Sequence, residues 1–405
     1  MIKFIIYGLS VGINRGLFFI LMPILAKILT LDDFAIFSIC LVSSQLLIPI
    51  LTVNCSSIIS REYYEKKYVA EFYYEIVCLF LTILIMLLTL LMLFFNNYKL
   101  YFVVFTLMEA GFFITSTFVR FKYDEKPEFF LYFSLVKLFI VASGFLILFK
   151  IDSIDLISIL LLLSFSNIHF LLFYFIYHLS KKNYNLNIVI HDTKYLVFAI
   201  ALLPHVLSQW IISGMDRFFV KYYQSTEQLA LYSIGYSIAS VYMLVNSALA
   251  LALPQLCVKN NSAYKDMSFK KYFFIVISLL SFVFLIFGKL LVFYFYDNNL
   301  YVYQVYISVF VGLYFLSYYY YYSSIVFYER NTYFISKSTI FVAVITLLML
   351  VFISMVNAKY ISFVTMLSYL LYFSVVYFKV EKSSFFEYSI ISFYGMLLLG
   401  VGYVL

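Results

Sequence analysis

The chain has 405 residues, of which 65% are hydrophobic and only 12% are charged, and its mean hydropathy is +1.00. These values exclude a water-soluble globular enzyme or binding domain and predict a polytopic membrane protein. The formal net charge is +7. This positive charge reflects the lysine and arginine residues that cytoplasmic loops of membrane proteins retain. Nothing in the sequence indicates a nucleic-acid partner.

Apolar runs long enough to cross a bilayer as helices follow one another along the chain, with short polar breaks. They are too long and too uniformly apolar for barrel strands, so we expect an all-α fold of about twelve transmembrane helices. A last run, 385–405, could add a thirteenth span. The twelve runs lie near 4–29, 34–58, 72–95, 99–119, 129–149, 155–178, 194–222, 229–254, 271–295, 301–326, 334–355 and 358–378.

The first run is interpreted as a retained span, because one lysine precedes it and no small-residue cleavage site follows it. The four cysteines show neither CxxC spacing nor histidine neighbours, so we expect them to pack as small apolar residues. No nucleotide-binding or metal-binding motif is present in the sequence. We therefore expect no cofactor and no metal, and not an enzyme.

The distribution of lysine and arginine predicts a cytoplasmic N-terminus, because cytoplasmic loops retain these residues. With this orientation, eighteen of the 27 basic residues lie at the cytoplasmic face and six at the opposite face. Three more, Arg15, Lys137 and Lys289, lie inside predicted spans.

A short phrase occurs twice, as "LDDFAIFSI" at 31–39 and as "TEQLALYSI" at 226–234, an offset of 195 residues. Six spans separate the two copies, so both halves enter the membrane in the same orientation. This pattern predicts two parallel six-helix bundles related by a pseudo-two-fold axis along the membrane normal. The expected domains are 1–180, a cytoplasmic linker at 181–193, 194–380, and a possible extra helix at 381–405.

Polar side chains also match at the 195-residue offset. They recur at helical spacing, so each helix carries one polar stripe. The stripes favour a shared central lumen, although small polar residues can also hold helices together in lipid. The aligned residues are Ser38, Gln45 and Thr52 with Ser233, Ser240 and Ser247, and Ser10 and Asn14 with His205 and Gln209.

Arg15 is the first charged residue inside a span and lies about mid-span, beside Asn14. A charge at the centre of a helix in lipid costs about 2.5–3.5 kcal/mol unless it faces protein or water. Two interpretations stay open, an ion pair that fixes helix packing or a lumen cation that binds an anionic group of the cargo. Substrate-binding candidates are Arg15, Asn14, Gln209 and Lys137.

Glu109 and Lys137 lie about ten and eight residues from the cytoplasmic ends of adjacent antiparallel spans, hence within ~3 Å in depth. We expect them to neutralise each other, and the alternative is that Glu109 is a proton or ion site. Asp216 and Arg217 lie near the outer interface, where a local ion pair and a gate both fit. His205 follows the helix-bending Pro204 and is either a packed histidine or a titrating switch. Glu109, His205, Asp216 and Arg217 are the coupling or gating candidates.

Several of these features together resemble a known family. An N-terminal span with an embedded arginine, an acidic loop running into "FAIFS", and a seventh span ending "SGMDRFFVKYY" before "LALYSIGYSIASVYMLVNSAL" are similar to Wzx-type polysaccharide flippases of the multidrug, oligosaccharidyl-lipid and polysaccharide exporter superfamily. The resemblance is closest over the first two helices of each half. Ala35 and Ala230 stand where members often have glycine.

The resemblance implies a carrier in the bacterial inner membrane that moves undecaprenyl-diphosphate-linked oligosaccharide to the outer leaflet by alternating access, for O-antigen or capsule assembly. It also implies coupling to H⁺, Na⁺ or the gradient of the cargo itself, and contact with the polymerase and chain-length machinery. A drug or cation antiporter of the same superfamily is an alternative, but should prefer acidic lumen residues. A membrane polysaccharide polymerase or ligase is a further alternative, but usually needs a large outer loop.

Overall fold

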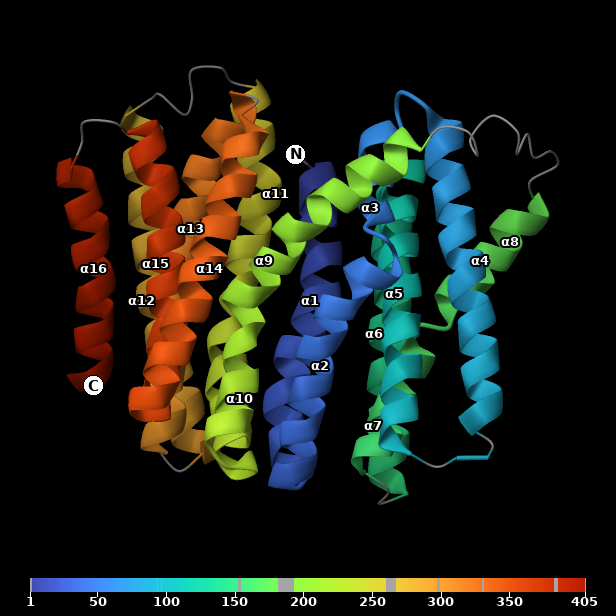
Figure 1. The fold of residues 1–405 in the computed structure, drawn as a ribbon, viewed down its shortest axis with the longest axis horizontal. Helices are drawn as coiled ribbons and strands as arrows, with labels where there is room; N and C mark the ends of the chain where they lie inside the picture. The colour runs from blue at the N-terminus through green and yellow to red at the C-terminus, as the bar shows by residue number, and fades with distance from the viewer. Residues whose placement is uncertain are drawn as a thin grey trace. The chain divides into compact units, whose positions relative to one another are not determined.

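The computed structural model describes residues 2–92, 94–95, 97–151, 154–180, 193–259, 267–296, 299–329, 331–381 and 385–404. Their regular secondary structure is helical throughout, which confirms the predicted all-α class. Figure 1 labels the α-helices. The elements are α1 (Ile2–Ile28), α2 (Leu31–Leu51), α3 (Cys55–Glu62), α4 (Lys67–Met92), α5 (Tyr98–Lys122), α6 (Glu128–Lys150), α7 (Leu156–Ser166), α8 (His169–Ser180), α9 (Lys194–Tyr223), α10 (Thr226–Ser240), α11 (Met243–Lys259), α12 (Met267–Tyr296), α13 (Leu300–Tyr328), α14 (Thr332–Asn357), the 3₁₀ helix η2 (Ala358–Tyr360), α15 (Ile361–Val380) and α16 (Phe385–Val404).

Ten helices of the described chain are long and apolar enough to cross a membrane, or eleven if the bent pair α10 and α11 is counted as one span. They include α16, which coincides with the run expected to add a further span. The chain therefore has the helices of a multi-pass membrane protein.

The structure divides into two compact units, each described here by itself. Unit 1 contains Met1–Asn14 and Ile36–Leu207, and unit 2 contains Arg15–Ala35 and Ser208–Leu405. The division therefore falls inside α1, α2 and α9. Of the linker expected at 181–193, residues 181–192 lie outside the described part of the chain.

Three of the predicted spans are interrupted. The run 34–58 forms α2 and α3, and between them Val53 (φ 46°) and Asn54 (φ 51°) adopt left-handed backbone. This conformation is unfavourable for a β-branched residue such as valine, because its Cβ crowds the backbone. The runs 155–178 and 229–254 divide at 167–168 and 241–242, the second with a bend of 48°.

The helices α14 and α15 form an antiparallel hairpin within a single apolar stretch of 48 residues. Thr346 donates to Ser368 over 2.8 Å, and the hydroxyls of Thr339 and Tyr372 lie 2.7 Å apart. Residue numbers rise along α14 while those of the partners fall along α15, so the two helices are antiparallel. A straight helix of this length would be about 70 Å long, more than twice the hydrocarbon thickness of a bilayer. The stretch therefore folds back on itself at η2.

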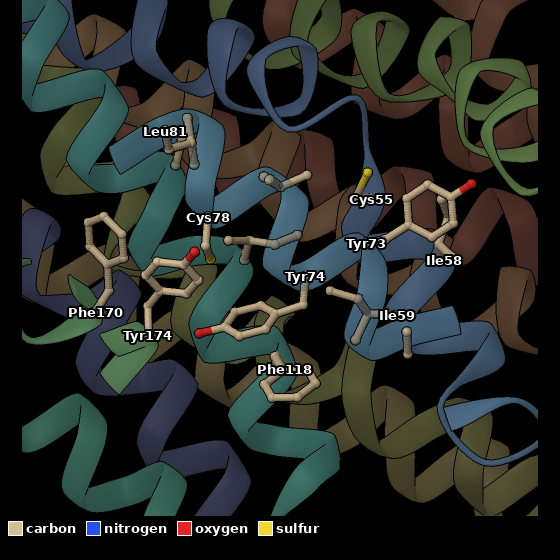
Figure 2. Close-up of a cluster of buried hydrophobic side chains, with 14 of the residues drawn as sticks. Cys55, Ile58, Ile59, Tyr73, Tyr74, Cys78, Leu81, Phe118, Phe170 and Tyr174 are labelled. Atoms are coloured by element: carbon tan, nitrogen blue, oxygen red, sulfur yellow. The ribbon is translucent and has the colours of Figure 1, made fainter. Parts of the chain in front are cut away.

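The core of unit 1 is a cluster of buried apolar and aromatic side chains from α3, α4, α5 and α8 (Figure 2). Tyr74 stacks on Phe118, with ring centroids 4.1 Å apart and an interplanar angle of 3°. The Tyr74 hydroxyl lies 3.4 Å from the hydroxyl of Thr115, so its polar end is also satisfied. Cys55 and Cys78 belong to this cluster, and all four cysteines are buried and outside disulfides, which confirms the packing role expected for them.

The helix α13 forms the centre of unit 2 and contacts α10, α11, α12, α15 and α16. In its "YYYYY" stretch, Tyr318, Tyr319, Tyr321 and Tyr322 are all buried. The Tyr319 and Tyr372 rings stack with centroids 3.8 Å apart, and Tyr372 donates to the Tyr319 hydroxyl over 2.7 Å. These tyrosines therefore build the core, a role that was not apparent from the sequence.

Candidate functional site

A buried ion pair lies between α5 and α6 of unit 1. The Nζ of Lys137 is 2.7 Å from Oε1 of Glu109, and Lys137 is 1% exposed. The pairing inferred from the similar depth of the two residues is thus confirmed. The ammonium also lies 4.2 Å from the centroid of the Phe112 ring, which adds a cation–π contact. Each charge has a partner of opposite sign, so neither is left uncompensated in the interior.

Asn167 completes the environment of this ion pair from the break between α7 and α8. Its Nδ2 donates to Glu109 Oε1 over 3.1 Å and to the carbonyl of Leu163 over 2.9 Å. His169 follows it, with its Nδ1 3.0 Å from the Ser166 carbonyl and its ring packed edge-on against Phe133, centroids 4.4 Å apart. The break in the sixth span thus brings an amide to a buried carboxylate.

Asn14 of α1 lies near the same cluster. Its Nδ2 donates to the hydroxyl of Ser134 over 2.9 Å, and Ser134 is one helical turn from Lys137 on α6. The Oδ1 of Asn14 is buried without a hydrogen-bond partner in the described residues. Arg15 belongs to α1, but its side chain lies outside the described part, so its expected role stays a prediction.

A second cluster surrounds Asp216 on α9 in unit 2. Asp216 is 2% exposed, and its Oδ2 accepts hydrogen bonds from Tyr232 on α10 and Thr365 on α15, each 2.7 Å long. Its Oδ1 accepts from the backbone N–H of Arg217 over 2.8 Å. The carboxylate is therefore stabilised by two hydroxyls and one amide, and it ties α9 to α10 and α15.

The side chain of Arg217 does not pair with Asp216. Among the described residues its guanidinium forms no ion pair, and its Nε is buried without a hydrogen-bond partner. The Cζ atom lies 3.9 Å from the centroid of the Tyr236 ring, whose hydroxyl donates to the Ser213 carbonyl over 2.6 Å. Of the two interpretations left open for Asp216 and Arg217, the local ion pair is not formed among the described residues, because adjacent helical residues point in different directions. The gate stays a prediction. Arg217 is only 8% exposed, so it is a buried cation available to an anion.

The other candidates from α9 are less enclosed. His205 is half-buried, and its Nδ1 has no hydrogen-bond partner among the described residues. Gln209, one turn further along α9, is exposed. The choice between a packed and a titrating histidine therefore stays open.

The two polar stripes are largely packed inside the protein. Five of the six serine, glutamine and threonine positions are buried, and Gln45 is exposed. The hydroxyls of Thr52 and Ser240 bond back to helical carbonyls, Ile48 at 2.9 Å and Tyr236 at 2.8 Å. Such bonds satisfy small polar groups within helix packing, which favours the helix-packing interpretation for this conformation.

Sequence reasoning missed the partners of both carboxylates. The partners are Asn167, Tyr232 and Thr365. The signal in the sequence that could have identified them is that each is a polar residue inside an apolar run. No group of three or more His, Cys, Asp or Glu side chains that could hold a metal ion occurs among the described residues. No family model, curated protein or solved structure matches the chain.

Proposed function

We propose that the protein is a secondary transporter that flips undecaprenyl-diphosphate-linked oligosaccharide from the cytoplasmic to the outer leaflet by alternating access. The observation that carries the proposal is an interrupted second helix in each half of the chain. Interrupted hydrophobic segments at corresponding positions of two halves are typical of secondary transporters, where they flank the binding site.

The correspondence can be followed element by element. In each half a long first helix, α1 or α9, precedes the repeated phrase; each contains a proline, but Pro23 and Pro204 do not align at the offset of 195 residues. The repeated phrase then begins the second helix, at Leu31 in α2 and close to Thr226 in α10. That helix breaks after 21 residues in the first half and after 15 in the second. The same order of features supports an origin of the two halves in one repeat.

The charges support an anionic cargo. Glu109 and Asp216, two buried acids inside these helices, already carry partners, which disfavours them as sites for a cationic drug. Arg217 is a buried cation whose guanidinium can form two parallel hydrogen bonds with a phosphate. A diphosphate linker is an anion of this kind, and the family resemblance supplies the oligosaccharide attached to it.

The finer topology belongs to the same proposal. We count α2 with α3, α7 with α8, and α10 with α11 as one span each, and α14 and α15 as two. Together with the other long helices these supply the twelve expected spans, and α16 supplies a thirteenth. Reporter fusions at Lys66 and Lys126 should then read cytoplasmic and fusions at Asp33 and Glu227 external. A cytoplasmic signal at Glu227 would remove the parallel repeat.

The function is tested by reconstitution. Purified protein is placed in vesicles that contain undecaprenyl-diphosphate-linked oligosaccharide, and the lipid that reaches the outer leaflet is measured by digestion with an added glycosidase. We expect the wild type to expose the sugar faster than protein-free vesicles do, Arg217→Ala to lose this acceleration, and the control Lys221→Ala, an exposed lysine on α9, to keep it.

Other results would contradict the proposal. Absence of flipping together with ion-driven efflux of a cationic dye would indicate the antiporter. Conversion of the added oligosaccharide into longer chains would indicate a polymerase.

A further inference from the structure

We infer that unit 2 binds one membrane phospholipid in a groove between α12, α13 and α16, with an acyl chain in the groove and the phosphate on Lys271. The groove has a volume of about 480 Å³. This inference rests only on the membrane-spanning character of the helices and not on the proposed cargo.

The packing of α16 explains why the groove exists. At Gly395, α16 approaches α13 so closely that an added Cβ would meet the ring of Phe315. The preceding residue, Tyr394, donates to the Ser278 carbonyl of α12 over 2.8 Å and fixes that end of the groove. Towards Phe386 the helices are held by charged side chains at the mouth of the groove, and the space between the helices is lined by Phe273, Phe274 and Tyr318.

The mouth of the groove is held by charge. Lys270 of α12 bonds Glu381 over 2.8 Å and also forms an ion pair with Glu387 of α16, so α12 and α16 are tied together there. The next residue, Lys271, also lines the groove, is exposed, and has no acidic partner in the described residues. Lys270 is paired with both glutamates, whereas Lys271 forms no ion pair among the described residues. Its ammonium group can therefore bind an anion from the membrane.

The sequence places this mouth at the membrane surface. The order Lys270, Lys271, Tyr272, Phe273, Phe274 runs from charged through amphipathic to apolar, the gradient expected where a span leaves the headgroup layer. Phe274 lies about 6 Å deeper than Lys270 at 1.5 Å per residue. A phosphate beside Lys271 would therefore have its acyl chain at the depth of the aromatic lining.

An apolar groove whose mouth carries a lysine without an ion pair in the described residues favours a phospholipid as its occupant. The deeper lining is apolar and offers water few hydrogen bonds, while an empty groove would forfeit dispersion contacts. Exposed Ile275 (51%) and Ile390 (40%) lie on its rim, so a chain can enter sideways from the bilayer. Phospholipid surrounds the protein as solvent, so mass action fills even a site of modest affinity.

The test uses a phosphatidylglycerol that carries a photoreactive diazirine in its acyl chain, added to the full-length protein in nanodiscs. After irradiation the labelled peptides are identified by mass spectrometry. We expect labelling to concentrate on 270–275 and 386–391. Ile390→Trp, which fills the groove, should reduce this labelling at least five-fold, whereas Phe393→Trp on the outward side of α16 (70% exposed) should leave it unchanged.

A second comparison tests the phosphate. A diacylglycerol with the same diazirine chain should label the groove at least five-fold less than the phospholipid does. Lys271→Ala should reduce phospholipid labelling to the diacylglycerol level, and the control Lys337→Ala, an exposed lysine of α14, should not. Equal labelling of exposed sites such as Phe139 would show ordinary lipid contact and overturn the inference. Stronger competition by undecaprenyl diphosphate than by phosphatidylglycerol would also overturn it, by assigning the groove to a polyprenyl lipid.

Discussion

Glu109 in unit 1 and Asp216 in unit 2 are both buried carboxylates, but the cations near them are used differently. Glu109 binds Lys137, which comes from another helix and 28 residues further along the chain. Asp216 is followed directly by Arg217, yet it takes its hydrogen bonds from two hydroxyls and a backbone amide. Neighbouring positions in sequence are thus a poor guide to pairing inside a helix, whereas equal depth on facing helices is a good one. In the first cluster the cation is paired with the carboxylate, and in the second the cation stays available.

The largest effect is expected from breaking the complete pair. Glu109→Gln should destabilise the protein by about 3–5 kcal/mol, because it leaves the Lys137 ammonium buried without its counter-ion. Membrane abundance and the thermal midpoint in detergent both report the loss. The double variant Glu109→Gln with Lys137→Met removes both charges and should restore most of the stability. Normal abundance of Glu109→Gln with loss of transport would instead make Glu109 a coupling site.

An intermediate effect is expected at Asp216. Asp216→Ala leaves the buried hydroxyls of Tyr232 and Thr365 without their acceptor and should cost about 1–3 kcal/mol. Asp216→Asn keeps one acceptor oxygen and should cost less. Thermal unfolding in detergent measures both, with Asp32→Ala at the exposed start of α2 as the control. If Asp216→Asn were as damaging as Asp216→Ala, the negative charge itself would be required and the comparison would fail.

The smallest effect on stability is expected at Arg217. Arg217→Gln removes a buried cation that forms no ion pair in the described structure and loses its contact with the Tyr236 ring, so unfolding should shift by about 1 kcal/mol, less than for Glu109→Gln. Inorganic pyrophosphate should raise the thermal midpoint of the wild type by binding the folded state and should leave that of Arg217→Gln unchanged. A strongly destabilised Arg217→Gln would mean that the guanidinium has a structural partner and that the two clusters are alike.

The all-α class followed from the sequence because uniform hydropathy over about 20 residues permits little else in a membrane. The Glu109–Lys137 pair followed from the similar depth of the two residues in adjacent antiparallel spans. The breaks at 52–54, 167–168 and 241–242 did not, because apolar residues on every side of a helix leave no periodic signal that a break could disturb. The partners of Asp216 come from α10 and α15, and one sequence does not tell which helices are neighbours across the bundle.

The central position of α13 has a consequence for how the protein is made. Its hydroxyls are satisfied by helices that precede it and by helices that follow it: Tyr306 donates to the Phe284 carbonyl of α12, and Tyr303 to the Gly402 carbonyl of α16, each over 2.7 Å. In lipid a polar group without such a partner is costly, so α13 reaches its lowest free energy only after α15 and α16 have left the ribosome. During synthesis about 75 residues must follow α13 before its last hydrogen-bond acceptor, the Gly402 carbonyl, is available.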